Sequence, residues 1–239
     1  MNIINKTSGT ILIEGKEFTK NDLETKSIIG YLPSEIHLYD DYTVKQMLDY
    51  HEKFYNKDTS KKRKELVKLF KIAENKKIED LSLGNLKKVG IVLALIHEPK
   101  LLILDEPTSG LDPIMQNIFN ELLLKEKEKG TTILYSTHVL SEVSKICDRV
   151  GIIKEGKLIK IESIEELSEK SLLSITIKSN SIEKIKKELE IDCPIINNTI
   201  KFHKNIEINK LIELLSKYKI DRLLIEESTI EDMFLHYYK

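Results

Sequence analysis

The chain has few cysteines and few arginines, and each shortage excludes a class of protein. Its two cysteines, Cys147 and Cys193, match no zinc or redox spacing, so neither a disulfide scaffold nor a thiolate metal site is expected. Lysines outnumber arginines by 35 to 3 and the formal net charge is −1, which disfavours a nucleic-acid partner. No apolar run reaches the ~18 residues of a membrane span, and the first residues show no signal-peptide pattern. We therefore expect a cytoplasmic protein.

Two adjacent carboxylates, Asp105 and Glu106, follow a four-residue apolar run at Leu101–Leu104. An apolar run without alternation predicts a strand buried on both faces of a parallel sheet. Such a strand delivers the acids to the carboxyl edge of the sheet, where open α/β folds hold ligands. There Asp105 suits a hydrated Mg²⁺ and Glu106 suits an attacking water, whereas the plainer alternative is a solvated acidic turn. Asp112 and Pro113 then predict the N-cap and first residue of a helix.

Apolar spacing, helix caps and turn residues predict the other elements of the first 170 residues. Strands are expected at residues 10–14, 27–32, 131–137, 149–153 and 157–161. Helices are expected at residues 43–55, from 60 onward, and at 86–97, 112–129 and 138–147, followed by a capping box at 163–166. Gly130 should end the helix at 112–129. Residues 43–97 thus form a helical subdomain.

From residue 171 the order of elements resets to strand, helix, strand, strand, helix, strand, which is the order of a ferredoxin-like unit. The expected elements cover residues 172–178, 181–190, 194–197, 199–203, 207–218 and 220–227, and a last helix covers 229–238. An Asn197–Asn198 turn joins the two central strands. We place a boundary near Lys170, which gives domains at residues 1–170 and 171–239.

Four motifs occur in an order and spacing that chance does not produce. Leu101–Glu106 looks like a Walker B strand with its catalytic glutamate, Ser109–Asp112 like a D-loop, and Ser136–His138 like a switch histidine. Leu81–Asn85 is similar to the signature Leu-Ser-Gly-Gly-Gln, and Thr229–Leu235 resembles a subfamily ending. The chain resembles the nucleotide-binding subunits of ATP-binding cassette (ABC) transporters. Within them it is similar to the multidrug- and antibiotic-export kind, which pairs with separate membrane subunits.

The resemblance implies an α/β fold with a truncated P-loop NTPase core of the ABC type, a helical subdomain, and a small α+β ferredoxin-like domain at the C-terminus. It also implies an ATPase in which Glu106 activates a water, His138 contacts the γ-phosphate and Asp105 holds Mg²⁺ through water. The implied nucleotide-binding residues are Ser82, Leu83, Gly84, Asn85, Asp112 and Ser34.

Each of these signals also has a plainer interpretation. Ser82 supplies a hydroxyl at a helix N-terminus, where the dipole favours anions, and Gly84 lets a backbone approach phosphate oxygens. Taken alone, the same residues describe an ordinary helix-start loop. A lone histidine at a strand end, such as His138, is otherwise most often a surface residue. The family context favours the functional interpretation of both.

The phosphate loop Gly-x-x-x-x-Gly-Lys-[Ser/Thr] does not occur in the 239 residues. Gly151–Lys157 fits seven positions, but Leu158 replaces the Mg²⁺-binding hydroxyl and the segment belongs to an expected hairpin. In the family, the sequence that begins here at Thr7 follows the helix opened by the phosphate loop. The resemblance therefore implies that roughly forty residues of the family pattern, phosphate loop included, would lie upstream of Met1.

Smaller departures from the family occur at two motifs. Ser34 stands where the family has a glutamine, and its side chain is too short to reach Mg²⁺ in the same way, although Glu35 follows it. Leu83 and Asn85 replace a glycine and a glutamine of the signature.

Two functions follow, one enzymatic and one not. The first is an ATP-hydrolysing exporter subunit, truncated and inactive alone, which associates with the inner face of the membrane through a permease partner. The second is a non-catalytic partner that donates Ser82 and Gly84 to another subunit's ATP site. Both imply a dimer, with itself or with a different subunit. The candidate permease contact is the loop Glu35–Tyr42, for which an ordinary exposed aromatic loop is the alternative. A cassette that acts on DNA or ribosomes is disfavoured because the chain has one cassette and no long coiled coil.

Overall fold

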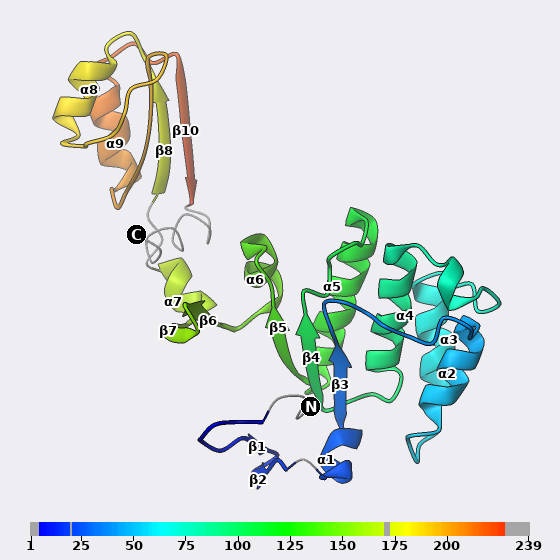
Figure 1. Ribbon diagram of the computed structural model, residues 1–239. Coiled ribbons are helices and arrows are strands. Elements are labelled where there is room, and N and C mark those ends of the chain that lie inside the picture. Colours follow the sequence, from blue (N-terminus) through cyan, green and yellow to red (C-terminus); the bar gives the residue numbers. More distant parts are fainter. Residues whose placement is uncertain (1–4, 20, 170–172, 228–239) are drawn as a thin grey trace. The chain divides into compact units, whose positions relative to one another are not determined.

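The structure, a computed structural model, describes residues 5–19, 21–169 and 173–227 (Figure 1). The chain separates into two compact units, residues 1–138 and 139–239. The expected boundary near Lys170 and the expected helix at 229–238 lie outside the described residues, so the division into domains at residue 170 stays a prediction.

The first unit is built on a three-stranded parallel sheet in the order β3–β4–β5. Leu32 pairs with Leu104, and Asp105 pairs with Ser136. All three strands therefore end at one edge of the sheet (Figure 1). The elements of this unit are β1 (Leu12–Ile13), β2 (Lys16–Glu17), α1 (Leu23–Ser27), β3 (Ile29–Leu32), α2 (Val44–Glu52), α3 (Ser60–Leu69), a 3₁₀ turn (Ile78–Asp80), α4 (Leu83–Leu95), β4 (Leu101–Asp105), α5 (Pro113–Glu128) and β5 (Thr132–Ser136).

Helix α4 packs closely on the sheet because two glycines leave room for neighbouring atoms. A Cβ added to Gly30 of β3 would lie 2.1 Å from the carbonyl oxygen of Ala94. A Cβ added to Gly90 of α4 would lie 2.4 Å from Ile36 Cδ1 and 2.9 Å from Leu32 Cδ1. Real Cβ atoms do not come this close, so α4 lies nearer to β3 than a helix with larger residues there could. The buried residues of α4 fill the core.

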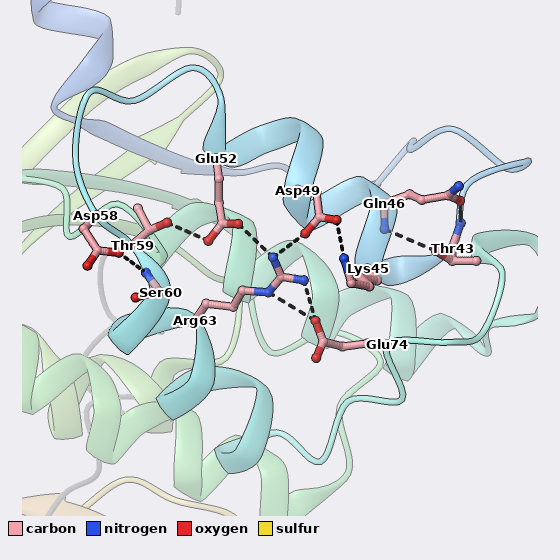
Figure 2. Close-up of polar contacts among 10 residues, drawn as sticks. All are labelled: Thr43, Lys45, Gln46, Asp49, Glu52, Asp58, Thr59, Ser60, Arg63 and Glu74. Atoms are coloured by element: carbon pink, nitrogen blue, oxygen red, sulfur yellow. Dashed lines mark hydrogen bonds and ion pairs between the residues drawn. The ribbon is translucent and has the colours of Figure 1, made fainter.

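The Arg63 guanidinium joins elements of the helical subdomain (Figure 2). Arg63 of α3 donates from Nη1 to Asp49 and Glu52 of α2 at 2.5 and 2.8 Å, and from Nη2 to Glu74 at 2.6 Å. Burial lowers the pKa of Arg63, but these bonds raise the pKa by more. The net pKa therefore lies above the ordinary value. Because Arg63 is little exposed, this charge-assisted fork fixes α2 against α3.

The second unit joins a hairpin to a small α+β layer. β6 and β7 pair antiparallel, as predicted. β8 lies between β10 and β9, and α8 and α9 cover one face through a core that includes Ile175, Ile185, Ile200 and Leu211. The elements are α6 (Leu140–Ile146), β6 (Arg149–Lys154), β7 (Lys157–Ser163), α7 (Ile164–Glu169), β8 (Leu173–Lys178), α8 (Ile182–Glu188), β9 (Thr199–Lys204), α9 (Ile208–Leu215) and β10 (Arg222–Glu227).

The prediction of a strand at residues 194–197 was wrong. That segment forms only an isolated bridge between Ile196 and Thr199. Pro194 has no N–H to donate to a ladder, which weakens the segment as a strand. Asn197 and Asn198, at φ 49° and 58°, then turn the chain as expected. The rest of the predicted β-α-β-α-β order is present.

Candidate functional site

The acid pair lies at the carboxyl edge of the sheet, as the sequence predicts. Asp105 is the last residue of β4 and lies opposite Ser136, the last residue of β5. The Ser136 hydroxyl donates to Asp105 Oδ1 at 2.5 Å. This bond fixes one carboxylate oxygen and leaves the other available for a ligand.

Glu106 adopts a backbone conformation that is unusual for its residue type. Its φ is +43°, in the left-handed region, where a non-glycine residue stores roughly 1–3 kcal/mol. Its N–H donates to the Ser136 carbonyl at 3.1 Å, which holds this conformation. Glu106 Oε1 lies 3.0 Å from His138 Nδ1. One carboxylate oxygen of Glu106 thus lies against the histidine, and the second oxygen can accept a proton from water.

The signature residues lie at the start of α4. Ser82 is the N-cap, and its Oγ accepts a hydrogen bond from the Asn85 N–H at 3.4 Å. Leu83 is exposed. A Cβ added to Gly84 would lie 2.8 Å from the Gly110 carbonyl oxygen. Close approach is therefore required at Gly84 within this chain, between the signature and the D-loop.

Two other residues predicted for the site, Asp112 and Ser34, form a helix cap and a backbone hydrogen bond. The Asp112 carboxylate accepts hydrogen bonds from Ile114 N at 3.1 Å and Met115 N at 3.0 Å, so it caps α5 as predicted. The Ser34 side chain is exposed, but its carbonyl oxygen accepts a hydrogen bond from Lys87 Nζ at 3.0 Å. The structure thus brings Asp105, Glu106 and His138 together, whereas Asp112 acts locally.

Sequence reasoning missed two contributors, Ser136 and Lys87. Ser136 stood inside the Ser-Thr-His motif without a role, although its place at the end of a parallel strand was a signal. Lys87 was the stronger signal, because Lys87 and Lys88 are two charged residues in a largely apolar helix.

The side chains at this site suit a metal ion that is also bound by the phosphates of a nucleotide. Among residues 5–19, 21–169 and 173–227, no three histidine, cysteine or acidic side chains gather as a metal site. Mg²⁺ is usually held by one or two carboxylates with waters and substrate phosphates. Asp105, with one oxygen fixed by Ser136, matches that smaller requirement.

The site defines the nucleotide-binding α/β class of protein. It has an acid pair at the end of one parallel strand, a histidine just after the next strand, and a signature at the capped start of a helix. The family model "ABC transporter" matches residues 1–109. The ABC transporter ATP-binding protein NatA of Bacillus subtilis is 36% identical over 173 residues, which cover 70% of this chain and 70% of NatA. The chain therefore belongs to the ABC transporter ATP-binding family.

Other relatives in Bacillus subtilis agree with this family. The ABC transporter ATP-binding protein YtrB is 35% identical over 168 residues, which cover 70% of this chain and 57% of YtrB. The linearmycin resistance ATP-binding protein LnrL is 36% identical over 165 residues, which cover 67% of this chain and 53% of LnrL. The chain thus spans about half the length of the first curated relatives it matches, 57% and 49% of the first two.

Solved structures share the fold. The ATP-binding subunit of an ABC transporter superposes with a TM-score of 0.64 at 23% identity, covering 87% of this chain and 77% of that one. The dimeric cassette MJ0796, bound to ADP and phosphate, gives 0.59 at 22% identity, covering 66% of this chain and 74% of that one. The fold is therefore that of an ABC cassette. None of the described helices is long and apolar enough to cross a membrane.

Proposed function

We propose that this chain is the ATP-hydrolysing subunit of an exporter that works through separate membrane subunits. The contact between Glu106 and His138, beside Asp105, carries the proposal. Glu106 takes a proton from the attacking water, while His138 holds one carboxylate oxygen and meets the γ-phosphate. Asp105, oriented by Ser136, holds Mg²⁺ through water. When bound, Mg²⁺ supplies charge that stabilises the phosphate oxygens.

Dimerisation completes the proposed site. Ser82 and Gly84 lie at the start of α4, where N–H groups and the helix dipole favour a phosphate. In the proposed dimer these residues face the nucleotide of a second subunit, with Leu83 and Asn85 beside them and Asp112 and Ser34 near the interface. The 239 residues contain no phosphate loop. The polypeptide alone should therefore bind Mg-ATP more weakly than micromolar and release no phosphate, which titration calorimetry and a phosphate assay measure.

A second function is favoured by the accessible signature, in which Ser82 is exposed. In it, the chain only donates Ser82 and Gly84 to the ATP site of a subunit that carries its own phosphate loop. Glu106 and His138 then have no nucleotide to act on. The contact of Glu106 with His138 favours the first function, because it orients a carboxylate that the second function does not use.

Two preparations separate the two functions through phosphate release: this chain with the phosphate-loop segment of a relative fused ahead of Met1, and this chain mixed with an intact phosphate-loop-bearing subunit. If this chain is catalytic, Glu106→Gln lowers the rate of the fusion at least 100-fold, the usual loss for a general base. If it only donates its signature, Ser82→Ala lowers the rate of the mixture and Glu106→Gln changes neither rate. Glu121→Gln, on an exposed part of α5, is the matched carboxylate control. A rate that neither Glu106→Gln nor Ser82→Ala changes would sink both.

The proposed permease contact lies on the helical subdomain, and it would place the chain at the inner face of the membrane. Tyr39 and Tyr42 of the predicted loop meet Tyr50 of α2, with ring centroids 5.9 and 6.3 Å away, and Tyr50 meets Phe54 at 5.2 Å. Tyr39 and Phe54 are exposed. Exposed aromatic groups of this kind suit a protein partner. Phe54→Ser should reduce co-purification with the membrane subunits, whereas Lys53→Ser should not.

A further inference from the structure

Lys87 is a buried cation beside the acid pair. Lys87 belongs to α4, and the residue is 4% exposed. Nζ donates to the carbonyl oxygens of Ser34 at 3.0 Å and Pro33 at 3.4 Å. Burial lowers the pKa of Lys87, while the charges of Asp105 and Glu106 favour its protonated form. A cation in such a place is costly unless these partners compensate it.

The register of the sheet explains why these groups meet. Leu32 pairs with Leu104, so Pro33 and Asp105 are the next residues of two parallel strands at the same edge. Gly90, one turn beyond Lys87 on α4, brings the helix onto Leu32 and Ile36. This close approach places the ammonium against the segment that follows β3.

We propose that Lys87 is a positioning residue for the reaction at Glu106, which fixes the Pro33–Ser34 segment against the acid pair. This inference rests on the proposed function, since it needs a reaction at Glu106. The ammonium draws the Pro33 and Ser34 carbonyls to the edge where Asp105 and Glu106 lie. It also offsets part of the negative charge gathered there. Lys87 touches no substrate in this role.

A measurement on the nucleotide-free chain tests the bond directly. In Lys87→Met, the Ser34 carbonyl carbon loses its donor, so its ¹³C resonance should move upfield. The amides of Ser34 and Glu35, in the same peptide units, should exchange about tenfold faster or more. Lys87→Arg keeps a cation with donors and should restore both values to near wild type. Lys88→Met, which removes the neighbouring charge from the same helix, should change neither.

Hydrolysis by the phosphate-loop fusion described above then tests the consequence. Lys87→Met should lower kcat about tenfold or more with KM within about twofold, and Lys87→Arg should recover most of the loss. Unchanged Ser34 signals in Lys87→Met, or no recovery in Lys87→Arg, would overturn the inference while wild-type hydrolysis still stood. An unchanged kcat in Lys87→Met would also overturn it. A wild-type fusion without hydrolysis would instead refute the proposed function, and the carbonyl shift alone would report the bond.

Discussion

Loss of one partner of the ion pair between Lys62 and Glu126 should destabilise the first unit by about 3 kcal/mol. Lys62 of α3 and Glu126 of α5 are joined at 2.8 Å, and their side chains are only 4% and 3% exposed. Burial acts against both charges, yet their hydrogen bond holds the pKa of Lys62 above its ordinary value and that of Glu126 below. Removing one partner leaves the other charge buried without the opposite charge that stabilises it most.

The magnitude lies at the low end of the ~3–5 kcal/mol known for broken buried pairs, because each survivor keeps a second partner. In Glu126→Gln, Lys62 retains Glu65 at 3.2 Å, and in Lys62→Met, Glu126 retains Lys129 at 3.0 Å. Glu65 and Lys129 are 52% and 55% exposed, so solvent screens both. The double variant Lys62→Met/Glu126→Leu removes both charges and should stay within about 1 kcal/mol of wild type.

Urea denaturation of the full chain measures this effect. Tyrosine fluorescence reports the first unit, because six of the nine tyrosines lie in residues 1–138. With a slope of ~2 kcal/mol per molar urea, each single variant should lower the midpoint by about 1.5 M. Glu65→Gln is the surface control and should cost at most ~1 kcal/mol. The reasoning is refuted if the single variants are no worse than Glu65→Gln, or if the double variant loses as much as both together.

Three further perturbations have expected outcomes. Burial lowers the pKa of His97 to about 4; the unfolded chain, with a pKa near 6.5, therefore takes up a proton first on acidification. Stability should fall by about 2 kcal/mol between pH 7.5 and 5, seen as a lower urea midpoint, and His97→Gln should lose most of this dependence. Gly30→Ala puts a Cβ 2.1 Å from the Ala94 carbonyl oxygen and should lower the melting temperature by about 10 °C, whereas an unchanged melt would contradict the packing. Ser136→Ala removes a donor to Asp105 and should cost about 1 kcal/mol in the same urea assay, and no loss would show the bond to be unimportant for folding.

Elements whose ends depend on one residue's local chemistry could be predicted from the sequence. Asp112 caps α5 and Pro113 begins it, as expected. Gly130, at φ 93°, ends that helix, and Asn197 and Asn198 make the expected turn. In each case a side-chain acceptor, a fixed ring or a positive φ favours few residue types.

Contacts that depend on how distant segments pack could not be predicted. The bond from Ser136 to Asp105 follows from the register of two strands, and the contact from His138 to Glu106 depends on an unusual backbone angle. The acid pair and the histidine could be named from their motifs, but their mutual geometry could not. Helix α1 was missed because its five residues show no apolar period, although Asp22 caps it through the Thr25 N–H.

Helix α4 connects the signature to the acid pair within this chain. Its first turn lies against the Gly110 carbonyl at Gly84, and its middle lies against Leu32 at Gly90. Between these contacts, Lys87 holds the Ser34 carbonyl only five residues beyond Ser82, roughly 7.5 Å along the helix axis. The neighbour at Gly84 is backbone and the neighbours at Gly90 are the side chains of Leu32 and Ile36, so α4 cannot move closer at either point without a clash. We therefore expect a shift at the start of α4 to move the segment beside Asp105 and Glu106 as well.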